Sequence, residues 1–356
     1  MSSERWVLQL CHGYDAPFDD VARQWRVLFD ETDYRVMTVF LTGKANPDVE
    51  SLVGSDKTLF WEYRSKDIKG LKRKQIRELR ALHEEYKFEF AICHRYKPTF
   101  IACHLPQVQV YGVAHAYGVF QSFWRKVFTY RHQKKLTLFG VSNAIRDNIR
   151  SALPWFPSEK VLTQYNHIDI NKYTREQLSR ESSRKFLGLP EDKYIIGNVG
   201  RLHPDKDQAT LLKAFSELKM PDSLLVVVGQ GRLERSLKAL AYELGVSERV
   251  LFLGRVENAW KYFKAFDVFA LSSDNEPFGM VLLEAIAAGI PVLSTNGGGA
   301  AEIVDENRQF AIGDYRSLAK LIVEMRSAES DQASQKIQSR FTDDGAKCHF
   351  RHVLDR

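Results

Sequence analysis

The chain has 356 residues, of which 44% are hydrophobic and 27% are charged, a globular balance that excludes a mainly disordered or fibrous protein. This length favours two domains. The net charge is +6, and the first half carries all of it: residues 1–170 contain 25 Lys and Arg against 19 Asp and Glu, whereas the remaining residues contain 26 basic and 26 acidic side chains.

The long segment from Phe90 to Arg146 contains no Asp or Glu, so we expect a basic face on the first half of the chain. Such a face suits an anionic partner, for example a phosphate-bearing lipid or an acidic glycan. Nucleic acid is not expected as a partner, because no recognised binding module for it is visible.

No apolar run approaches the ~18 residues that a membrane span needs, and residues 1–10 lack the apolar core of a secretory signal. We therefore expect a cytoplasmic protein. The cysteines are scattered along the chain and predict free thiols: Cys11, Cys93, Cys103 and Cys348.

Short apolar strands alternate with longer amphipathic segments along the whole chain. In the first half the expected strands are Trp6–Leu10, Arg35–Phe40, Phe88–Cys93, Gln107–Val113, Leu136–Val141 and Lys160–Gln164, with helices such as Asp67–Tyr86 and Ala144–Ser151. In the second half the expected strands are Tyr194–Val199, Ser223–Val228, Arg249–Leu253, Val268–Leu271 and Pro291–Ser294, with helices over Gln208–Leu218, Leu233–Leu244, Gly279–Ala288 and Tyr315–Met325.

This alternation predicts the α/β class, with two Rossmann-like, doubly wound parallel-sheet domains. We expect residues 1–170 to form the first domain and residues 171–340 the second. Residues 341–356 are expected to form a helix that packs back toward the first domain.

Several loops of the second half follow predicted strands at their carboxyl ends, where open α/β sheets bind ligands. The loop from Gly200 to Asp207 combines a glycine turn with the cations Arg201 and Lys206, directly before a helix. This combination suits a diphosphate, although a solvated charged loop would have the same residues. Asp205 and Asp207 form a D-x-D pair, but the intervening lysine argues against a metal site.

The segment from Glu276 to Val292 is the most specific feature. It contains a nearly all-apolar helix in which Glu284 is the only ionisable residue. A buried carboxylate is costly unless it is paired, so we expect Glu284 either to bind ribose hydroxyls or to pair with a core Arg or Lys. Glu276, in the loop before this helix, can accept hydrogen bonds from a sugar, and three backbone amides after it can donate to the same ligand: those of Phe278, Gly279 and Met280.

Two glycine-containing turns complete the set. Gly229 and Gly231 follow a strand and either place backbone near a nucleotide or only form a turn. The run Gly297–Gly299 opens a short helix that contains Glu302, which is either a ligand contact or only an acid at a helix start.

Together these motifs resemble the retaining glycosyltransferases of the GT-B fold, specifically the group 1, or family four, type. The resemblance is specific from about Ile195 to Val304. It rests on the G-R-L…K-D loop, the E-x7-E pair and the following G-G…E-I-V, in which Ala301 stands where the family usually has proline.

The resemblance implies a role for each of these residues. Arg201 and Lys206, with Gly200, would hold the donor's diphosphate in place of a metal ion. Glu284 would bind the nucleotide ribose. Glu276, with the backbone of residues 278–280, would hold the donor sugar.

The first half resembles the family's acceptor domain more loosely. His115 follows a strand and is similar to the family's strand-end histidine, which faces the reacting centre; the alternative is a buried core histidine. The run from Asn166 to Asp169 is similar to the family's N-G-V-D turn, with His167 in place of glycine. Only Gly13 matches the family's N-terminal glycine loop.

The resemblance implies two domains that face each other across a cleft, and a retaining, metal-independent transfer of a hexose from a nucleotide-diphosphate sugar, UDP-sugar above others, to a carbohydrate acceptor. No cofactor or metal is expected. The acid-free segment further suggests an anionic acceptor, namely a phosphorylated glycolipid or lipopolysaccharide core on the inner face of a bacterial membrane. We expect the enzyme to be peripheral on the inner membrane, in contact with its anionic surface.

Three questions stay open at this point. The same fold also serves sugar-nucleotide 2-epimerases and hydrolases, and a non-catalytic glycan- or membrane-binding protein is an alternative of another class. The basic stretch Lys66–Arg80 and the aromatic and basic stretch Phe120–Phe128 are either membrane-surface elements or ordinary helix faces. Cys93-His94 and Cys103-His104 hint at zinc but lack the usual ligand spacing.

Overall fold

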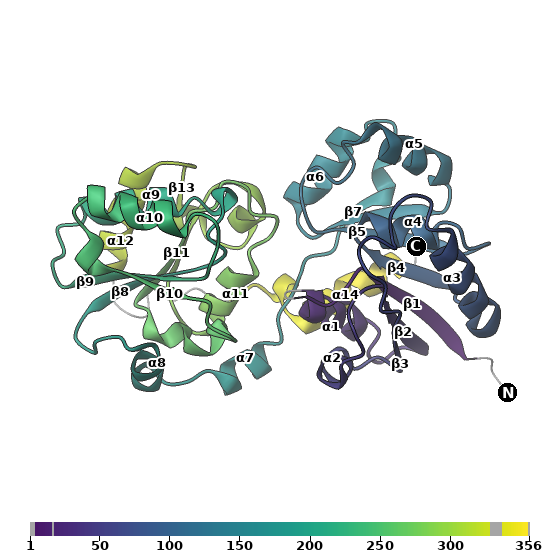
Figure 1. The fold of residues 1–356 in the computed structure, drawn as a ribbon, viewed down its shortest axis with the longest axis horizontal. Coiled ribbons are helices and arrows are strands. Elements are labelled where there is room, and N and C mark those ends of the chain that lie inside the picture. Colours follow the sequence, from purple (N-terminus) through teal and green to yellow (C-terminus); the bar gives the residue numbers. More distant parts are fainter. Residues whose placement is uncertain (1–3, 16–17, 328–336, 355–356) are drawn as a thin grey trace. The chain divides into compact units, whose positions relative to one another are not determined.

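The computed structural model describes residues 4–15, 18–327 and 337–354. The chain forms two compact units (Figure 1). Unit 1 contains the described residues up to His167 and from Asp343 onward, and unit 2 contains Ile168–Thr342. The chain therefore passes between the units twice.

Unit 1 is built on a seven-stranded sheet with the order β3-β2-β1-β4-β5-β6-β7, in which every neighbouring pair is parallel. Its strands are β1 (Arg5–Cys11), β2 (Tyr34–Phe40), β3 (Lys57–Phe60), β4 (Phe90–His94), β5 (Gln109–Ala114), β6 (Leu136–Gly140) and β7 (Val161–Thr163). The inner strands β4 and β6 are buried along their whole length, as helices on both faces require.

The helices of unit 1 include one from the far end of the sequence. They are α1 (Phe18–Val27), α2 (Pro47–Val53), α3 (Arg73–Tyr86), α4 (Tyr96–Ala102), α5 (Phe123–His132), α6 (Asn143–Ala152) and α14 (Asp343–Leu354). The C-terminal helix α14, yellow in Figure 1, packs against α1. Its buried Phe350 contacts the rings of Trp25, Phe29 and Phe139 at centroid distances of 5.7, 5.6 and 6.3 Å. The last helix thus closes the core of unit 1.

Unit 2 contains a six-stranded, fully parallel sheet with the order β10-β9-β8-β11-β12-β13. Its strands are β8 (Tyr194–Val199), β9 (Ser223–Val228), β10 (Val250–Gly254), β11 (Val268–Leu271), β12 (Val292–Thr295) and β13 (Gln309–Phe310). The strand order reverses between β8 and β11. Ligands of open α/β sheets bind beside such a reversal, at the carboxyl ends of the strands.

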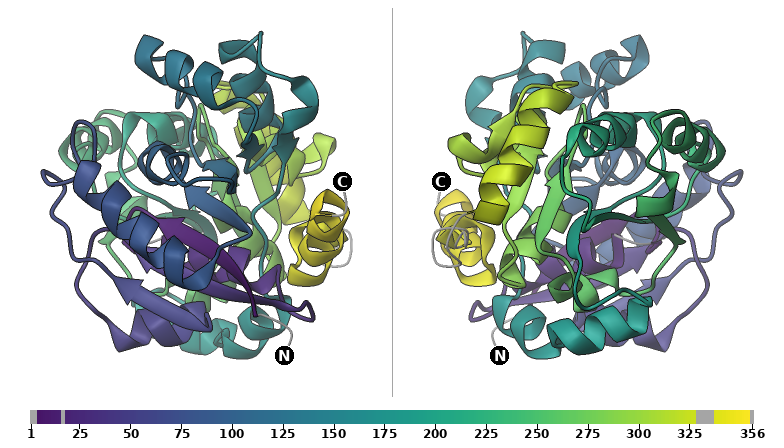
Figure 2. Two further views of the ribbon diagram at one scale, coloured as in Figure 1. Left: turned by 90° about the vertical axis from the view of Figure 1, so that its right-hand side faces the viewer. Right: turned by 90° about the vertical axis from the view of Figure 1, so that its left-hand side faces the viewer.

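The helices of unit 2 form two layers that can be followed in Figure 1 and in the right-hand view of Figure 2. One layer holds α9 (Gln208–Glu217), α10 (Glu234–Glu243) and α12 (Tyr315–Ser327). The other holds α7 (Ile170–Glu176), α8 (Arg180–Leu187), α11 (Met280–Ala287) and the 3-10 segment η4 (Ala259–Ala265). Two parallel-sheet α/β domains confirm the predicted fold class.

The structure departs from the predicted elements in three places. The short edge strands β3 and β13 were not predicted, because β3 is half-exposed along its length and β13 has only two residues. The helix predicted from Asp67 begins only at Arg73, since Gly70 and Lys72 adopt positive φ angles of 61° and 52°. Within the described residues no helix is long and apolar enough to cross a bilayer.

Candidate active site

The loop after β8 carries the two cations expected to bind a diphosphate. Gly200 follows the strand directly, and residues 204–206 form a single 3-10 turn, η2. Arg201 extends into solvent with its side chain 75% exposed, 3.8 Å from the carboxylate of Asp205. Lys206, by contrast, is largely buried and lies against the neighbouring loop.

Lys206 forms an ion pair with Glu276, with 2.5 Å between Nζ and Oε2. The same carboxylate oxygen accepts a hydrogen bond of 3.0 Å from the hydroxyl of Ser273. Both partners are largely buried, with side chains 16% and 10% exposed, and in a buried ion pair of this kind the attraction offsets the cost of desolvation only when the geometry is good and further hydrogen bonds are present. The loops after β8 and β11, neighbours in the sheet, are thereby joined at the reversal of strand order.

A backbone hydrogen bond strengthens this connection, because the amide of Asp274 donates to the carbonyl of Asp205 over 3.0 Å. Asp207, the second acid of the D-x-D pair, is the N-cap of α9: its carboxylate accepts hydrogen bonds from the amide and hydroxyl of Thr210. Among the described residues no group of three or more His, Cys, Asp or Glu side chains could hold a metal ion. The capping role explains Asp207 without a metal.

Gly229 and Gly231 have a packing role. A Cβ on Gly229 would lie 1.9 Å from the carbonyl oxygen of Gly200, and one on Gly231 would lie 2.3 Å from that of Leu202. Gly229 also has a φ of 140°, which side chains rarely adopt. Both glycines let the turn after β9 contact the cationic loop directly, so their link to a nucleotide stays a prediction.

The start of α11 brings the remaining predicted donor contacts together. Phe278 is buried, Gly279 is the N-cap with a φ of 103°, and Met280 is half-buried at the first helical position. Glu284 lies one turn further along the same helix and is half-buried. The glycine turn after β12 packs against this segment, since a Cβ on Gly299 would lie 2.4 Å from the carbonyl oxygen of Pro277.

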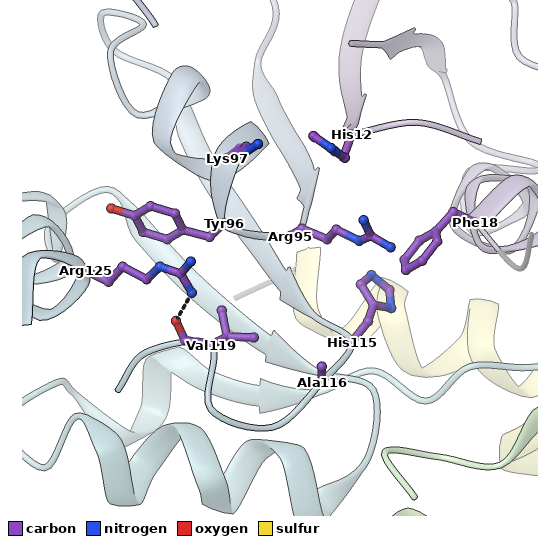
Figure 3. A pocket seen from close by; sticks show the side chains of 9 residues that line it. All are labelled: His12, Phe18, Arg95, Tyr96, Lys97, His115, Ala116, Val119 and Arg125. Atoms are coloured by element: carbon purple, nitrogen blue, oxygen red, sulfur yellow. Dashed lines mark hydrogen bonds between the residues drawn. The ribbon is translucent and has the colours of Figure 1, made fainter. Parts of the chain in front are cut away.

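His115 lies in unit 1, at the end of β5, in a pocket of about 440 Å³ (Figure 3). Its Nε2 is 3.1 Å from Nδ1 of the buried His94, which ends β4. Burial, with a smaller contribution from the Arg95 charge, lowers the pKa of His115 to about 3, so the imidazole is neutral at physiological pH. A neutral ring that shares a hydrogen bond with a second histidine can donate to or accept from a ligand hydroxyl. The catalytic role predicted for His115 stays a prediction.

Comparison with known proteins decides the family. Residues 179–347 match the model of the family described as glycosyl transferases group 1, which covers nearly all of unit 2. An uncharacterized glycosyltransferase of Methanocaldococcus jannaschii is 30% identical over 238 residues, 61% of this chain and 60% of that protein.

Residues 179–347 belong to the group 1 glycosyl transferases.

A further relative and a solved structure extend the comparison. A lipopolysaccharide core biosynthesis glycosyltransferase of Rhizobium meliloti is 26% identical over 196 residues, covering 52% of this chain and 57% of that protein. The chain spans between 45% and 60% of the first curated relatives it matches. The crystal structure of Anabaena HepE in complex with UDP and glucose superimposes with a TM-score of 0.78 and 19% identity, over 98% of this chain and 99% of that one. At this identity the likeness shows the fold, which is the predicted GT-B fold.

The sequence motifs single out several loops of unit 2, and the structure brings two of them together in a pairing that the motifs did not predict. Lys206 and Glu276 were assigned to different parts of the donor, whereas the structure shows them in contact. Ser273, which shares the carboxylate of Glu276, had no signal in the sequence. Four of the predicted site residues therefore lie on adjacent loops or on the helix that follows: Arg201, Lys206, Glu276 and Glu284.

Proposed function

We propose that this chain transfers a hexose from a nucleotide-diphosphate sugar to a carbohydrate acceptor with retention of anomeric configuration. The observation that carries the proposal is the Lys206–Glu276 ion pair, placed at the reversal of strand order in unit 2. A cation and a carboxylate held together there match the two ends of an activated sugar, one anionic and one rich in hydroxyls. We infer that the donor is a UDP-hexose.

The proposed chemistry needs charge stabilisation more than acid catalysis. As the bond between the anomeric carbon and the diphosphate oxygen breaks, negative charge grows on the diphosphate, where Lys206 and Arg201 stabilise it. The acceptor hydroxyl forms the new bond to the anomeric carbon on the same face, and its proton passes to the leaving phosphate oxygen. Glu276 holds a hydroxyl of the donor sugar and favours the positive charge that develops on the ring. In this scheme two side-chain cations stabilise the diphosphate charge in place of a metal ion, so the transfer is metal-independent.

We further propose that the acceptor is a phosphorylated glycolipid, such as a lipopolysaccharide core. The acid-free segment Phe90–Arg146 of unit 1 supports an anionic acceptor, and one relative is named for lipopolysaccharide core biosynthesis. The pocket beside His115 in unit 1 offers a place for a carbohydrate acceptor, which transfer needs and which hydrolysis and epimerisation do not.

The acceptor's lipid would require contact with a membrane, and α5 offers a suitable surface. Along one stripe of this helix Phe123, Trp124 and Tyr130 are 68%, 76% and 60% exposed. Trp155 packs against Tyr130 with ring centroids 5.3 Å apart. Aromatic side chains among cations, in a segment without acids, are typical of elements that lie on an anionic bilayer surface. We propose that α5 is this element.

Product analysis tests the reaction. The full chain is incubated with UDP- and GDP-hexoses, with and without a phosphorylated glycolipid. Nucleotide diphosphate released only with the acceptor, together with an α-linked product from an α-linked donor, supports the proposal. Free hexose without acceptor dependence, a C2 epimer, or no turnover of any nucleotide sugar would each contradict it. Addition of EDTA should leave the rate unchanged.

Vesicle flotation tests the membrane contact. The chain should float with phosphatidylglycerol vesicles and not with phosphatidylcholine vesicles. The double variant Phe123→Ala/Trp124→Ala should lose most of this binding, because it removes the two most exposed rings of α5. Tyr242→Ala is the matched control, since Tyr242 is 78% exposed on α10 of unit 2. Equal flotation of all three proteins would overturn the role of α5.

A further inference from the structure

The pocket beside His115 is lined by cations that the proposed chemistry leaves unassigned. Its lining comes from the ends of β1, β4 and β5 and from the segments that follow them (Figure 3). Arg95, Lys97 and Arg125 each contribute a side chain to it. At about 440 Å³ it has the size of an ordinary small-molecule site.

These cations have no counter-charge in close contact in the part of the chain that the structure describes. Within residues 4–15, 18–327 and 337–354, none of Arg95, Lys97 and Arg125 forms an ion pair with a carboxylate. The exposed carboxylate of Asp15 acts on Arg95 at longer range. Burial, reinforced by the charges of Lys97 and Arg125, lowers the pKa of the nearby Lys72. The cluster is therefore self-repelling until an anion enters it.

Aromatic rings hold two of the cations in place. The guanidinium of Arg95 lies 3.6 Å from the centroid of Phe18, and that of Arg125 lies 4.6 Å from the centroid of Tyr96. Arg125 also donates a 2.7 Å hydrogen bond to the carbonyl of Val119, drawn in Figure 3. Such contacts fix the position of a guanidinium without neutralising it.

The backbone of Arg95 adds an independent observation. Its φ of 74° and ψ of 168° fall in a region that almost only glycine occupies. An arginine persists in such a conformation only when the surroundings impose it, and residues of this kind gather at ligand sites. The strained residue is the one whose guanidinium lies over the ring of Phe18 in the wall of the pocket.

We propose that this pocket binds a phosphate monoester carried by the acceptor, through Arg95, Lys97 and Arg125. A phosphate dianion offers the charge and the several acceptor oxygens that three unpaired cations require. The assignment as an acceptor subsite rests on the proposed function, whereas the affinity for phosphate does not. The phosphate can stand on a sugar or on a lipid, and the experiment separates these sources.

Calorimetric titration of the full chain with glucose 6-phosphate, in a buffer free of phosphate, tests the soluble form, with glucose as the uncharged comparison. The wild-type chain should bind the phosphate ester and not glucose. Lys97→Gln and Arg95→Gly should each weaken binding by roughly 10-fold or more, because each removes a charge-assisted hydrogen bond. Lys87→Gln, which removes an exposed cation just before the amino end of β4, is the matched control and should bind as wild type.

A second arm uses vesicles of phosphatidylcholine with and without phosphatidic acid, which presents the phosphate on a lipid. Loss of binding in Lys97→Gln and Arg95→Gly, in either arm, supports the subsite and identifies its source. If neither variant differs from wild type in either arm, the proposal is wrong. Donor turnover is measured separately: a chain that binds glucose 6-phosphate but consumes no nucleotide sugar would contradict the proposed function and leave the phosphate site standing.

Discussion

His167 and Asp343 form a hydrogen bond of 2.7 Å between Nδ1 and Oδ1, and so connect the residue that precedes unit 2 with the residue at which the chain returns from it. Asp343 also pairs with Arg23 of α1 over 3.0 Å, and Arg23 in turn pairs with Asp20. These contacts anchor the first residue of α14, whose Phe350 completes the core of unit 1.

This anchor predicts an acid-sensitive contribution to stability. Burial opposes ionisation of Asp343, but the His167 hydrogen bond and the Arg23 charge outweigh it and lower its pKa to about 2. A carboxyl whose pKa is lower in the folded state stabilises the fold above its unfolded pKa and loses that effect as the pH falls toward 2. We expect a contribution of about 2 kcal/mol near pH 7, of which roughly half remains at pH 3.

Urea unfolding of Asp343→Asn at pH 7 and pH 3 checks this prediction. The difference in free energy of unfolding between the variant and the wild type should be smaller at pH 3 than at pH 7. Asp344→Asn is the control, because Asp344 is also in the first turn of α14 but its side chain is 95% exposed. An equal loss of stability in both variants would mean that these carboxylates act only through the helix dipole at this end of α14.

The Lys206–Glu276 contact predicts non-additive effects on turnover. Lys206→Ala should lower kcat by on the order of 10²- to 10³-fold, the usual cost of one electrostatic contact in the transition state. Glu276→Gln should have a similar effect, and the double variant should be little worse than either single one, because the two side chains touch. Lys213→Ala is the control, because Lys213 is an exposed cation on α9, and this variant should keep the kcat of the wild type. Fully additive losses would show that the pair does not act as a unit.

The close contact between Gly229 and Gly200 predicts that donor turnover depends on a residue with no side chain. Gly229→Ala forces its Cβ toward the carbonyl oxygen of Gly200, so the cationic loop must shift. We expect turnover to fall by about 10²-fold, as displacements of about 1 Å commonly produce. Gly245→Ala also strains a positive φ, of 69°, but meets nothing within 4 Å.

The comparison of these two variants isolates the loop contact from backbone strain. Gly245→Ala should cost about 1–2 kcal/mol of stability and leave turnover unchanged. Circular dichroism of each sample confirms that it is folded before turnover is measured. Equal turnover in both variants would remove the role assigned to the contact.

The fold could be predicted from the sequence because parallel strands are buried on both faces. The runs Tyr194–Val199 and Ser223–Val228 are apolar except for Asn198 and Ser223, and they become β8 and β9 with the predicted bounds. The edge strand β3 is not apolar in this way: it begins with Lys57 and Thr58, all four of its residues are half-exposed, and no continuous apolar run marks it.

The pairing within the candidate site could not be predicted in the same way. Lys206 and Glu276 are 70 residues apart, and their contact depends on β8 and β11 being neighbours in the sheet. Strand order is a tertiary property that the local pattern of either loop does not contain. The motifs therefore identified the loops of the candidate site, and only the topology showed which of their side chains meet.

The conformation of Arg95 could not be predicted from the sequence either, because an arginine at a given position does not indicate a positive φ. Its conformation predicts an inverted order of stability for two substitutions. Arg95→Gly relieves the backbone strain, whereas Arg95→Ala keeps a Cβ in the same disfavoured region; both lose the contact with Phe18. Alanine is ordinarily the more stable of the two, because glycine loses more backbone entropy on folding. Here the glycine variant should be the more stable by about 1 kcal/mol or more, which corresponds to a melting temperature higher by roughly 2–4 °C.

Thermal unfolding of the two variants, side by side with titration of glucose 6-phosphate, separates the backbone from the charge. Both variants lack the guanidinium, so both should bind the phosphate ester equally weakly while differing in stability. A glycine variant that melts below the alanine variant would show that the φ of Arg95 is not strained in solution. A glycine variant at least as stable as wild type would mean that the arginine is kept at the expense of stability, as expected for a side chain selected for what it binds.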